Sequence, residues 1–155
     1  MSKHGPNRLL AYIEIHETVL AKLRRGGFVE SDNLELLPLP GDVLHMEGEV
    51  RCAGGLVITV DKYLRIVDGA GTADPTVQTY SYAYNVSLAG RGNVFRYDNA
   101  HDHAGHRDRH HRHQYDHRTG AALEVTWVGP DWPTLGKVIE EARAWYWAHH
   151  DELTG

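Results

Sequence analysis

The sequence predicts an α+β fold, with an antiparallel sheet of about five or six strands flanked by an N-terminal and a C-terminal helix. Apolar residues recur at helical spacing near both ends of the chain, and the segments between them alternate with period two. Glycine-rich turns separate these segments, as in antiparallel strands joined by short connections. The chain has 155 residues, the usual length of one domain, so we expect a single domain over residues 1–155.

The first helix is predicted over residues 7–25. Asn7 is a suitable N-cap, and the glycine pair at 26–27 is a strong stop signal. One side of this helix is apolar because hydrophobic residues recur every three or four positions. That side consists of Leu9, Tyr12, Ile13, His16, Leu20 and Leu23.

An acidic stretch follows the first helix and leads into the predicted sheet. Residues 30–42 contain Pro38 and Pro40, which predicts an irregular connection with at most a short extended start at 28–29. Beyond it, alternating segments bounded by glycine predict strands. The predicted strands cover residues 43–52, 56–67, 77–88, 93–98, 111–116 and 121–128.

A second helix is predicted to begin within residues 131–134. Pro133 suits a first turn, and Asp131 or Thr134 can cap the helix. The side of this helix that faces the core is again set by helical spacing. It consists of Leu135, Val138, Ile139, Ala142, Trp145 and Tyr146.

Composition restricts the class of protein. The net charge is −5 with histidines neutral, which argues against a nonspecific nucleic-acid coat but allows a local basic site. Cys52 is the single cysteine, so no intramolecular disulfide can form, as is usual in a reducing compartment. No apolar run approaches the roughly 20 residues of a membrane span, and the N-terminus lacks the apolar core of a signal peptide. We therefore expect a cytoplasmic protein without a membrane partner.

The densest chemistry lies in residues 95–117, which hold seven of the twelve histidines, interleaved with arginine and aspartate. The ordinary pKa of histidine, near 6.5, suits both proton donation and proton removal near neutral pH. RNA cleavage through the 2′-hydroxyl needs a base, an acid and a cation for the phosphorane, and none of these has to be a metal. The candidate acid–base groups are His101, His111 and His113, with Asp98 to orient a histidine tautomer, and the candidate phosphate ligands are Arg96 and Arg112.

Two other interpretations of this segment remain open. His101 and His103, and likewise His111 and His113, are spaced i, i+2, which puts both members of a pair on one side of a strand. Two such pairs, or one pair with Asp98 or Asp116, could hold a divalent metal ion. The segment could also be a solvated loop whose histidines have no special role.

The pattern Arg96-Tyr-Asp-Asn-Ala-His101, followed by His110-His-Arg-His113, resembles the TumE family, small toxins of bacterial and archaeal toxin–antitoxin pairs. The matching residues include Tyr97 and Asn99, which the resemblance suggests as further substrate contacts. The chain departs from the family pattern in two ways. It has extra histidines and an arginine in the spacer, and it lacks a proline before the second half.

The resemblance implies a toxin neutralised by a co-encoded antitoxin, often a helix-turn-helix protein. Combined with the histidine chemistry, it predicts a type II toxin acting as a metal-independent ribonuclease on RNA, without a cofactor, with a homodimer as one option. One alternative is a noncatalytic RNA-binding or assembly subunit of an antiviral defence ribonucleoprotein, with bases stacked on Tyr80, Tyr82 and Tyr84. A histidine-rich metal-binding protein is the other alternative.

Overall fold

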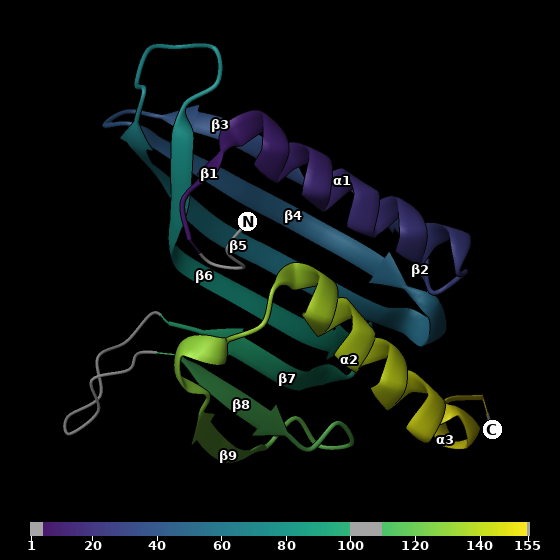
Figure 1. Ribbon diagram of the computed structural model, residues 1–155. Helices are drawn as coiled ribbons and strands as arrows, with labels where there is room; N and C mark the ends of the chain where they lie inside the picture. Colours follow the sequence, from purple (N-terminus) through teal and green to yellow (C-terminus); the bar gives the residue numbers. More distant parts are fainter. Residues whose placement is uncertain (1–4, 100–109, 155) are drawn as a thin grey trace.

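The computed structural model describes residues 5–99 and 110–154. In this part of the chain one antiparallel sheet of nine strands carries α1 and α2 side by side on the same face (Figure 1). The main strand order is β2-β4-β5-β6-β7-β8-β9, while β1 pairs with β6 and β3 with β4. The strands are β1 (Asn7–Arg8), β2 (Val29–Asp32), β3 (Glu35–Leu39), β4 (Val43–Cys52), β5 (Leu56–Asp68), β6 (Thr76–Leu88), β7 (Gly92–Asp98), β8 (His111–Tyr115) and β9 (Ala122–Trp127).

The helices occupy the two ends of the chain, as predicted. They are α1 (Leu9–Arg25), α2 (Leu135–Ala148) and the short α3 (His150–Thr154), with 3₁₀ turns η1 (Ala53–Gly55) and η2 (Gly129–Asp131). Gly136 lets α1 and α2 approach closely, because a Cβ at this position would lie 2.8 Å from Cγ1 of Val19. In the described residues, no helix is long and apolar enough to cross a membrane.

The α+β class is confirmed, but the expected strand number was too low. All six predicted strands are present, and the structure adds β1, β2 and β3. The segment 30–42 was predicted to be irregular because of its prolines, yet Pro38 lies within β3 and pairs with Leu44. Since β3 pairs only with β4, its other edge needs no ladder hydrogen bond, and proline is tolerated on such edges. Gly41 and Asp42, both with positive φ, form the turn into β4.

The two predicted helix caps had different outcomes. Asn7 is not the N-cap of α1, because it lies in β1 opposite Val77. The first turn of α1 is instead capped from the β5–β6 loop, where the carboxylate of Asp74 accepts a hydrogen bond of 2.9 Å from the backbone N–H of Leu10. Thr134 does cap α2, since its hydroxyl accepts from the N–H of Lys137 at 3.3 Å. A local signal thus located one cap, whereas a distant loop supplies the other.

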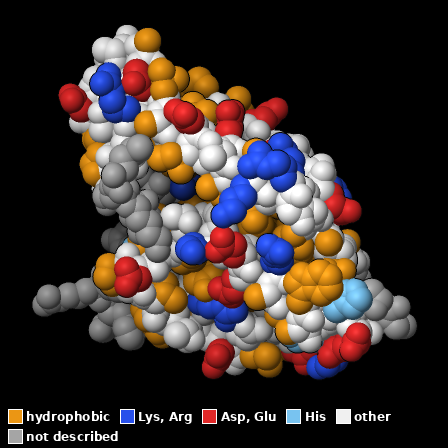
Figure 2. Space-filling model, turned by 45° about the vertical axis from the view of Figure 1, so that its right-hand side comes forward, with side chains coloured by type: hydrophobic (Ala, Val, Ile, Leu, Met, Phe, Trp, Pro, Cys, Tyr) orange, Lys and Arg blue, Asp and Glu red, His pale blue; other side chains and the backbone are white. Residues whose placement is uncertain are grey.

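The core lies between the helices and the sheet face that they cover, which we call the inner face. Val60, Tyr84 and Phe95 on the sheet, and Val138 and Ile139 on α2, are each no more than 1% exposed. Burial of the core that contains these side chains stabilises the fold by about 25 cal/mol per Å² of apolar area removed from water. Basic, acidic and hydrophobic side chains are intermixed on the surface drawn in Figure 2, so no single-sign patch dominates that view.

The opposite, outer face of the sheet is defined by register. Asp61 pairs with Ala83, Ala83 with Asp98, and Asp98 with His111, so one row of side chains crosses β5 to β8 on this face. The tyrosines of β6 do not form the expected continuous stripe. Tyr82 and Tyr84 are buried on the inner face, but a bulge at the β5–β6 pairing leaves Tyr80 40% exposed.

Candidate functional site

The pairing of β7 with β8 sorts the histidine segment onto two faces. Arg96 pairs with His113 and Asp98 with His111, whereas Tyr97, between them, pairs with Arg112. Because side chains alternate along a strand, the first four share the outer face and the last two share the inner face. The predicted site residues are therefore divided into two groups with different neighbours.

On the outer face, the carboxylate of Asp98 connects three basic side chains. Its Oδ2 accepts a hydrogen bond of 2.5 Å from Nε of Arg96 and lies 3.5 Å from Nε2 of His113. Its Oδ1 lies 2.7 Å from Nε2 of His111. The two imidazole rings meet edge to face, with centroids 4.7 Å apart. We call Arg96, Asp98, His111 and His113 the Asp98 cluster.

The electrostatics of the cluster keep Asp98 ionised. Burial is the largest single influence and would raise its pKa. The hydrogen bond from Arg96 and the charges of His111, Arg96 and His113 together outweigh burial and lower the pKa below its ordinary value. Asp98 is thus an anion near neutral pH, suited to holding an imidazole in one orientation and stabilising it when protonated.

Exposure differs sharply within the cluster. His111 is 0% exposed and Asp98 only 3%, whereas the side chain of His113 is 24% exposed and that of Arg96 35%. Only the last two can meet a substrate without rearrangement. His111 and Asp98 are buried beneath Arg96 and His113 and hold them in place.

The same residues could hold a metal ion. One ligand atom each from Asp98, His111 and His113 lies within 4.8 Å of the others. Two imidazoles and a carboxylate form the donor set of many zinc and non-haem iron sites. Arg96 would compete with such an ion because its guanidinium already binds the same carboxylate.

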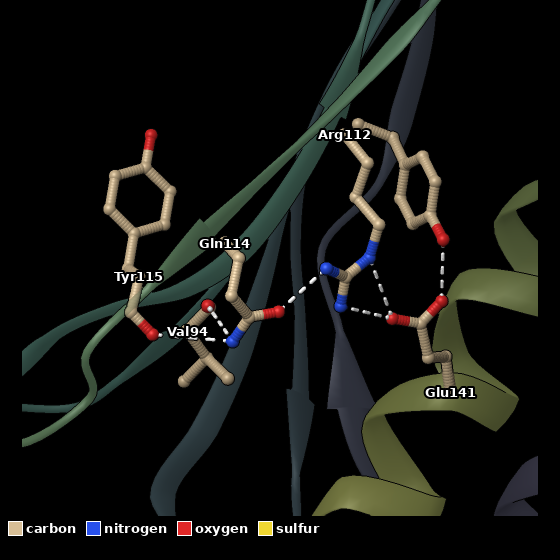
Figure 3. Close-up of polar contacts among 6 residues, drawn as sticks. Val94, Arg112, Gln114, Tyr115 and Glu141 are labelled. Carbon is tan, nitrogen blue, oxygen red and sulfur yellow. Dashed lines mark hydrogen bonds and ion pairs between the residues drawn. The ribbon is translucent and has the colours of Figure 1, made fainter. Parts of the chain in front are cut away.

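The inner-face group forms a separate polar network beneath α2 (Figure 3). Arg112 donates from Nη2 to Oε2 of Glu141 at 2.8 Å and from Nη1 to the side chain of Gln114 at 2.6 Å. The hydroxyl of Tyr97 donates to Oε1 of the same Glu141 at 2.6 Å. Burial, followed by this hydrogen bond, raises the pKa of Tyr97 to about 12. The structure therefore joins Arg112 and Tyr97 to a helix and does not bring them into the Asp98 cluster.

Two other predicted site residues, Asn99 and His101, follow β7 in the sequence. The side-chain amide of Asn99 bridges to β6, accepting from the N–H of Tyr82 at 2.9 Å and donating to the carbonyl of Tyr80 at 3.0 Å. Asn99 thus fastens the end of β7 beside the bulge that exposes Tyr80. His101, the expected partner of His113, lies outside the described residues, as do His103 and His106.

Sequence reasoning missed three residues that contact the predicted ones or their neighbours. Glu141 anchors the inner network by binding Tyr97 and Arg112. In the sequence, the one indication of this role was an acidic residue beside the apolar side of the second helix. On the outer face, Tyr63 and Arg65 flank Tyr80, with ring centroids 6.1 Å apart and the guanidinium 4.6 Å from the ring. No periodic signal marks this group, because the β-bulge that gathers it breaks the alternation.

Fold and site together define the class of protein: a small α+β domain with an Asp–His–Arg cluster, partly buried and partly exposed, on the sheet face opposite the helices. The chain also matches the protein family described as Toxin TumE over residues 19–145, which is most of its length. It therefore belongs to the TumE toxin family, as its motif suggested. Comparison with curated proteins and with solved structures gave no match.

Proposed function

We propose that this toxin is a metal-independent endoribonuclease whose active centre is the Asp98 cluster. The observation that carries the proposal is the ionised, buried Asp98 carboxylate, which touches a partly exposed histidine and a partly exposed arginine at once. This is a base, its orienting group and a cation within a few ångströms, which is the arrangement needed for acid–base chemistry on a phosphodiester.

In the proposed mechanism His113 removes the proton from a ribose 2′-hydroxyl. Its Nε2 faces Asp98, so proton transfer would use Nδ1. The 2′-oxygen attacks phosphorus, the bond from phosphorus to the 5′-oxygen breaks, and a general acid protonates that leaving oxygen. His101 is our candidate for the acid. Arg96 binds Asp98 through Nε, and its terminal nitrogens would stabilise charge on the phosphorane.

The other predicted residues take supporting roles in this proposal. His111 is too buried to meet RNA, so it positions Asp98. Arg112 and Tyr97 hold β7 and β8 against α2, rather than gripping phosphate. Asn99 positions the end of β7. Of the site residues that the sequence predicted, we thus propose that Arg96, His113 and His101 are the ones that contact the substrate.

Charge on the outer face indicates where RNA would lie. A hollow across β3 to β5 is lined by Glu35, Glu47, Glu49 and Asp61, and these carboxylates repel phosphate. On the same face, Arg65 of β5 lies four residues beyond Asp61, and its guanidinium lies over the ring of Tyr80 on β6, so this pair offers an aromatic face with an adjacent cation. RNA would therefore cross β6 to β9, with a base on Tyr80.

The test uses protein purified without a nickel column, incubated with single-stranded RNA in excess EDTA. We expect cleavage that leaves 2′,3′-cyclic phosphate ends and is lost in His113→Gln. His150→Gln is the matched control, because its imidazole lies on α3 and should leave the rate unchanged. Full activity of His113→Gln in EDTA would overturn the assignment.

A metal-dependent reaction is the second candidate, favoured by the convergence of Asp98, His111 and His113. It predicts loss of cleavage in EDTA, restoration by one divalent ion and stoichiometric bound metal. The noncatalytic alternative predicts RNA binding that is steeply salt dependent, without turnover, and insensitive to loss of a single histidine. In every case we propose a co-encoded helix-turn-helix protein as the antitoxin.

A further inference from the structure

A cavity of about 290 Å³ lies on the other side of the sheet from the Asp98 cluster, where α1 and α2 meet the inner face. Its walls include Tyr12 and His16 from α1, Leu135 and Ile139 from α2, and Trp132 before α2. The volume corresponds to roughly ten water molecules at about 30 Å³ each. This is close to the lower end of the range for small-molecule sites, so the cavity suits a compact ligand.

Lys62 lines this cavity and is the feature that packing alone does not explain. It lies on the inner face of β5 and is only 8% exposed. Its ammonium nitrogen lies 5.0 Å from the ring centroid of Tyr12 and 5.9 Å from that of Tyr84. In the described part of the chain, no carboxylate lies within ion-pair distance of it. A buried ammonium without a counter-ion is unfavourable unless something else supplies the negative charge.

The surroundings of Lys62 favour the binding of an anion in the cavity. Burial lowers the pKa of Lys62 to about 8, with no acidic group acting against the shift. Burial, together with the charge of Lys62, lowers the pKa of His16 to about 4, so this neighbouring imidazole is neutral. Among the described residues that line the cavity, Lys62 is the one cation, and the other side chains are aromatic, aliphatic or neutral.

We propose that this cavity binds a small carboxylic acid with an apolar body, whose carboxylate pairs with Lys62 while its hydrocarbon part packs between α1 and α2. The size and wall chemistry fit a molecule such as an arylalkanoic acid. The site is independent of the ribonuclease proposal, because none of its wall residues belongs to the Asp98 cluster.

The test compares two isosteric probes on the full chain, 3-phenylpropionate and its neutral amide, at pH 7. Binding is followed by NMR shifts of the Leu135 and Ile139 methyl groups, which line the cavity. We expect the acid to bind at least tenfold more tightly than the amide, with the largest shifts at these methyls. Equal affinities, or shifts that avoid the cavity, would overturn the proposal, and neither result would bear on RNA cleavage.

A substitution tests whether the charge of Lys62 causes the preference for the acid over the amide. Lys62→Met keeps most of the side-chain volume, so we expect it to abolish the preference for the acid while leaving amide binding intact. Lys137→Met, which removes an exposed lysine of α2, is the matched control and should preserve the preference. Circular dichroism checks folding, and the probe comparison on the unmodified chain decides the question even if Lys62→Met unfolds. An unchanged preference in folded Lys62→Met would refute the role of Lys62.

Discussion

Asp98 and His111 face each other across β7 and β8, with Oδ1 of the carboxylate 2.7 Å from Nε2 of the imidazole and both side chains at most 3% exposed. Charged and polar groups so deeply buried are costly unless they are paired. The pair therefore links two roles: it stabilises the strand pairing, and it fixes the carboxylate that orients His113. The stability and the activity of the protein should both depend on Asp98.

Asp98→Asn should destabilise the protein by about 3 kcal/mol, because it removes the anion that pairs with buried His111 and with the partly exposed Arg96 and His113. Urea unfolding measures the change. Asp61→Asn is the matched control, since Asp61 lies on the same face but is 57% exposed where it contacts His45. The control should cost less than about 1 kcal/mol. Equal effects of the two substitutions would contradict a buried ionic role for Asp98.

The contribution of Asp98 to stability should also depend on pH. Its pKa is lower in the folded protein than in the unfolded chain, so folding favours the ionised form. That contribution is complete above the unfolded pKa of about 4 and is lost as the pH falls through the lower folded value. The gap in unfolding free energy between wild type and Asp98→Asn should narrow as the pH falls below about 4, where Asp98 becomes protonated. A gap that widens below about pH 4 would contradict the lowered pKa.

The sequence motif placed the candidate site on β7 and β8, but it could not assign its residues to the two faces of the sheet. The sequence singled out His101, His111 and His113 among the seven histidines, but period two predicts only that neighbouring side chains alternate between faces. The register of β7 against β8 decides that His113 joins Asp98 while Arg112 faces α2. Glu141 follows Arg112 by 29 positions and Asp74 follows Leu10 by 64, so both contacts depend on tertiary packing. The helices and central strands needed no such information, because their patterns are local.

Glu141→Gln should lower the pKa of Tyr97 without affecting the Asp98 cluster. Burial is the largest cause of the raised value of about 12, and the hydrogen bond and charge of Glu141 are the next causes. We therefore expect a partial fall that stays above 10, measured by NMR of the Tyr97 ring. Stability should fall by about 1 kcal/mol, since Arg112 and Glu141 are partly exposed. Glu140→Gln is the control, because Glu140 pairs only with exposed Lys137 among the described residues. A large loss of RNA cleavage in Glu141→Gln would indicate that Arg112 belongs to the active centre after all.

Tyr80→Leu should weaken RNA binding while leaving the chemical step intact. The Tyr80 ring is 40% exposed on the outer face and is held by Asn99 at its backbone and Arg65 at its ring. Stacking of a base on an aromatic side chain is worth about 1–3 kcal/mol, so KM should rise by roughly tenfold with kcat unchanged. Tyr80→Phe keeps the aromatic face and should behave as wild type. If Tyr80→Leu lowers kcat at constant KM, or if Tyr80→Phe is equally impaired, RNA does not cross the sheet beside this ring, and the path over β6 to β9 is wrong.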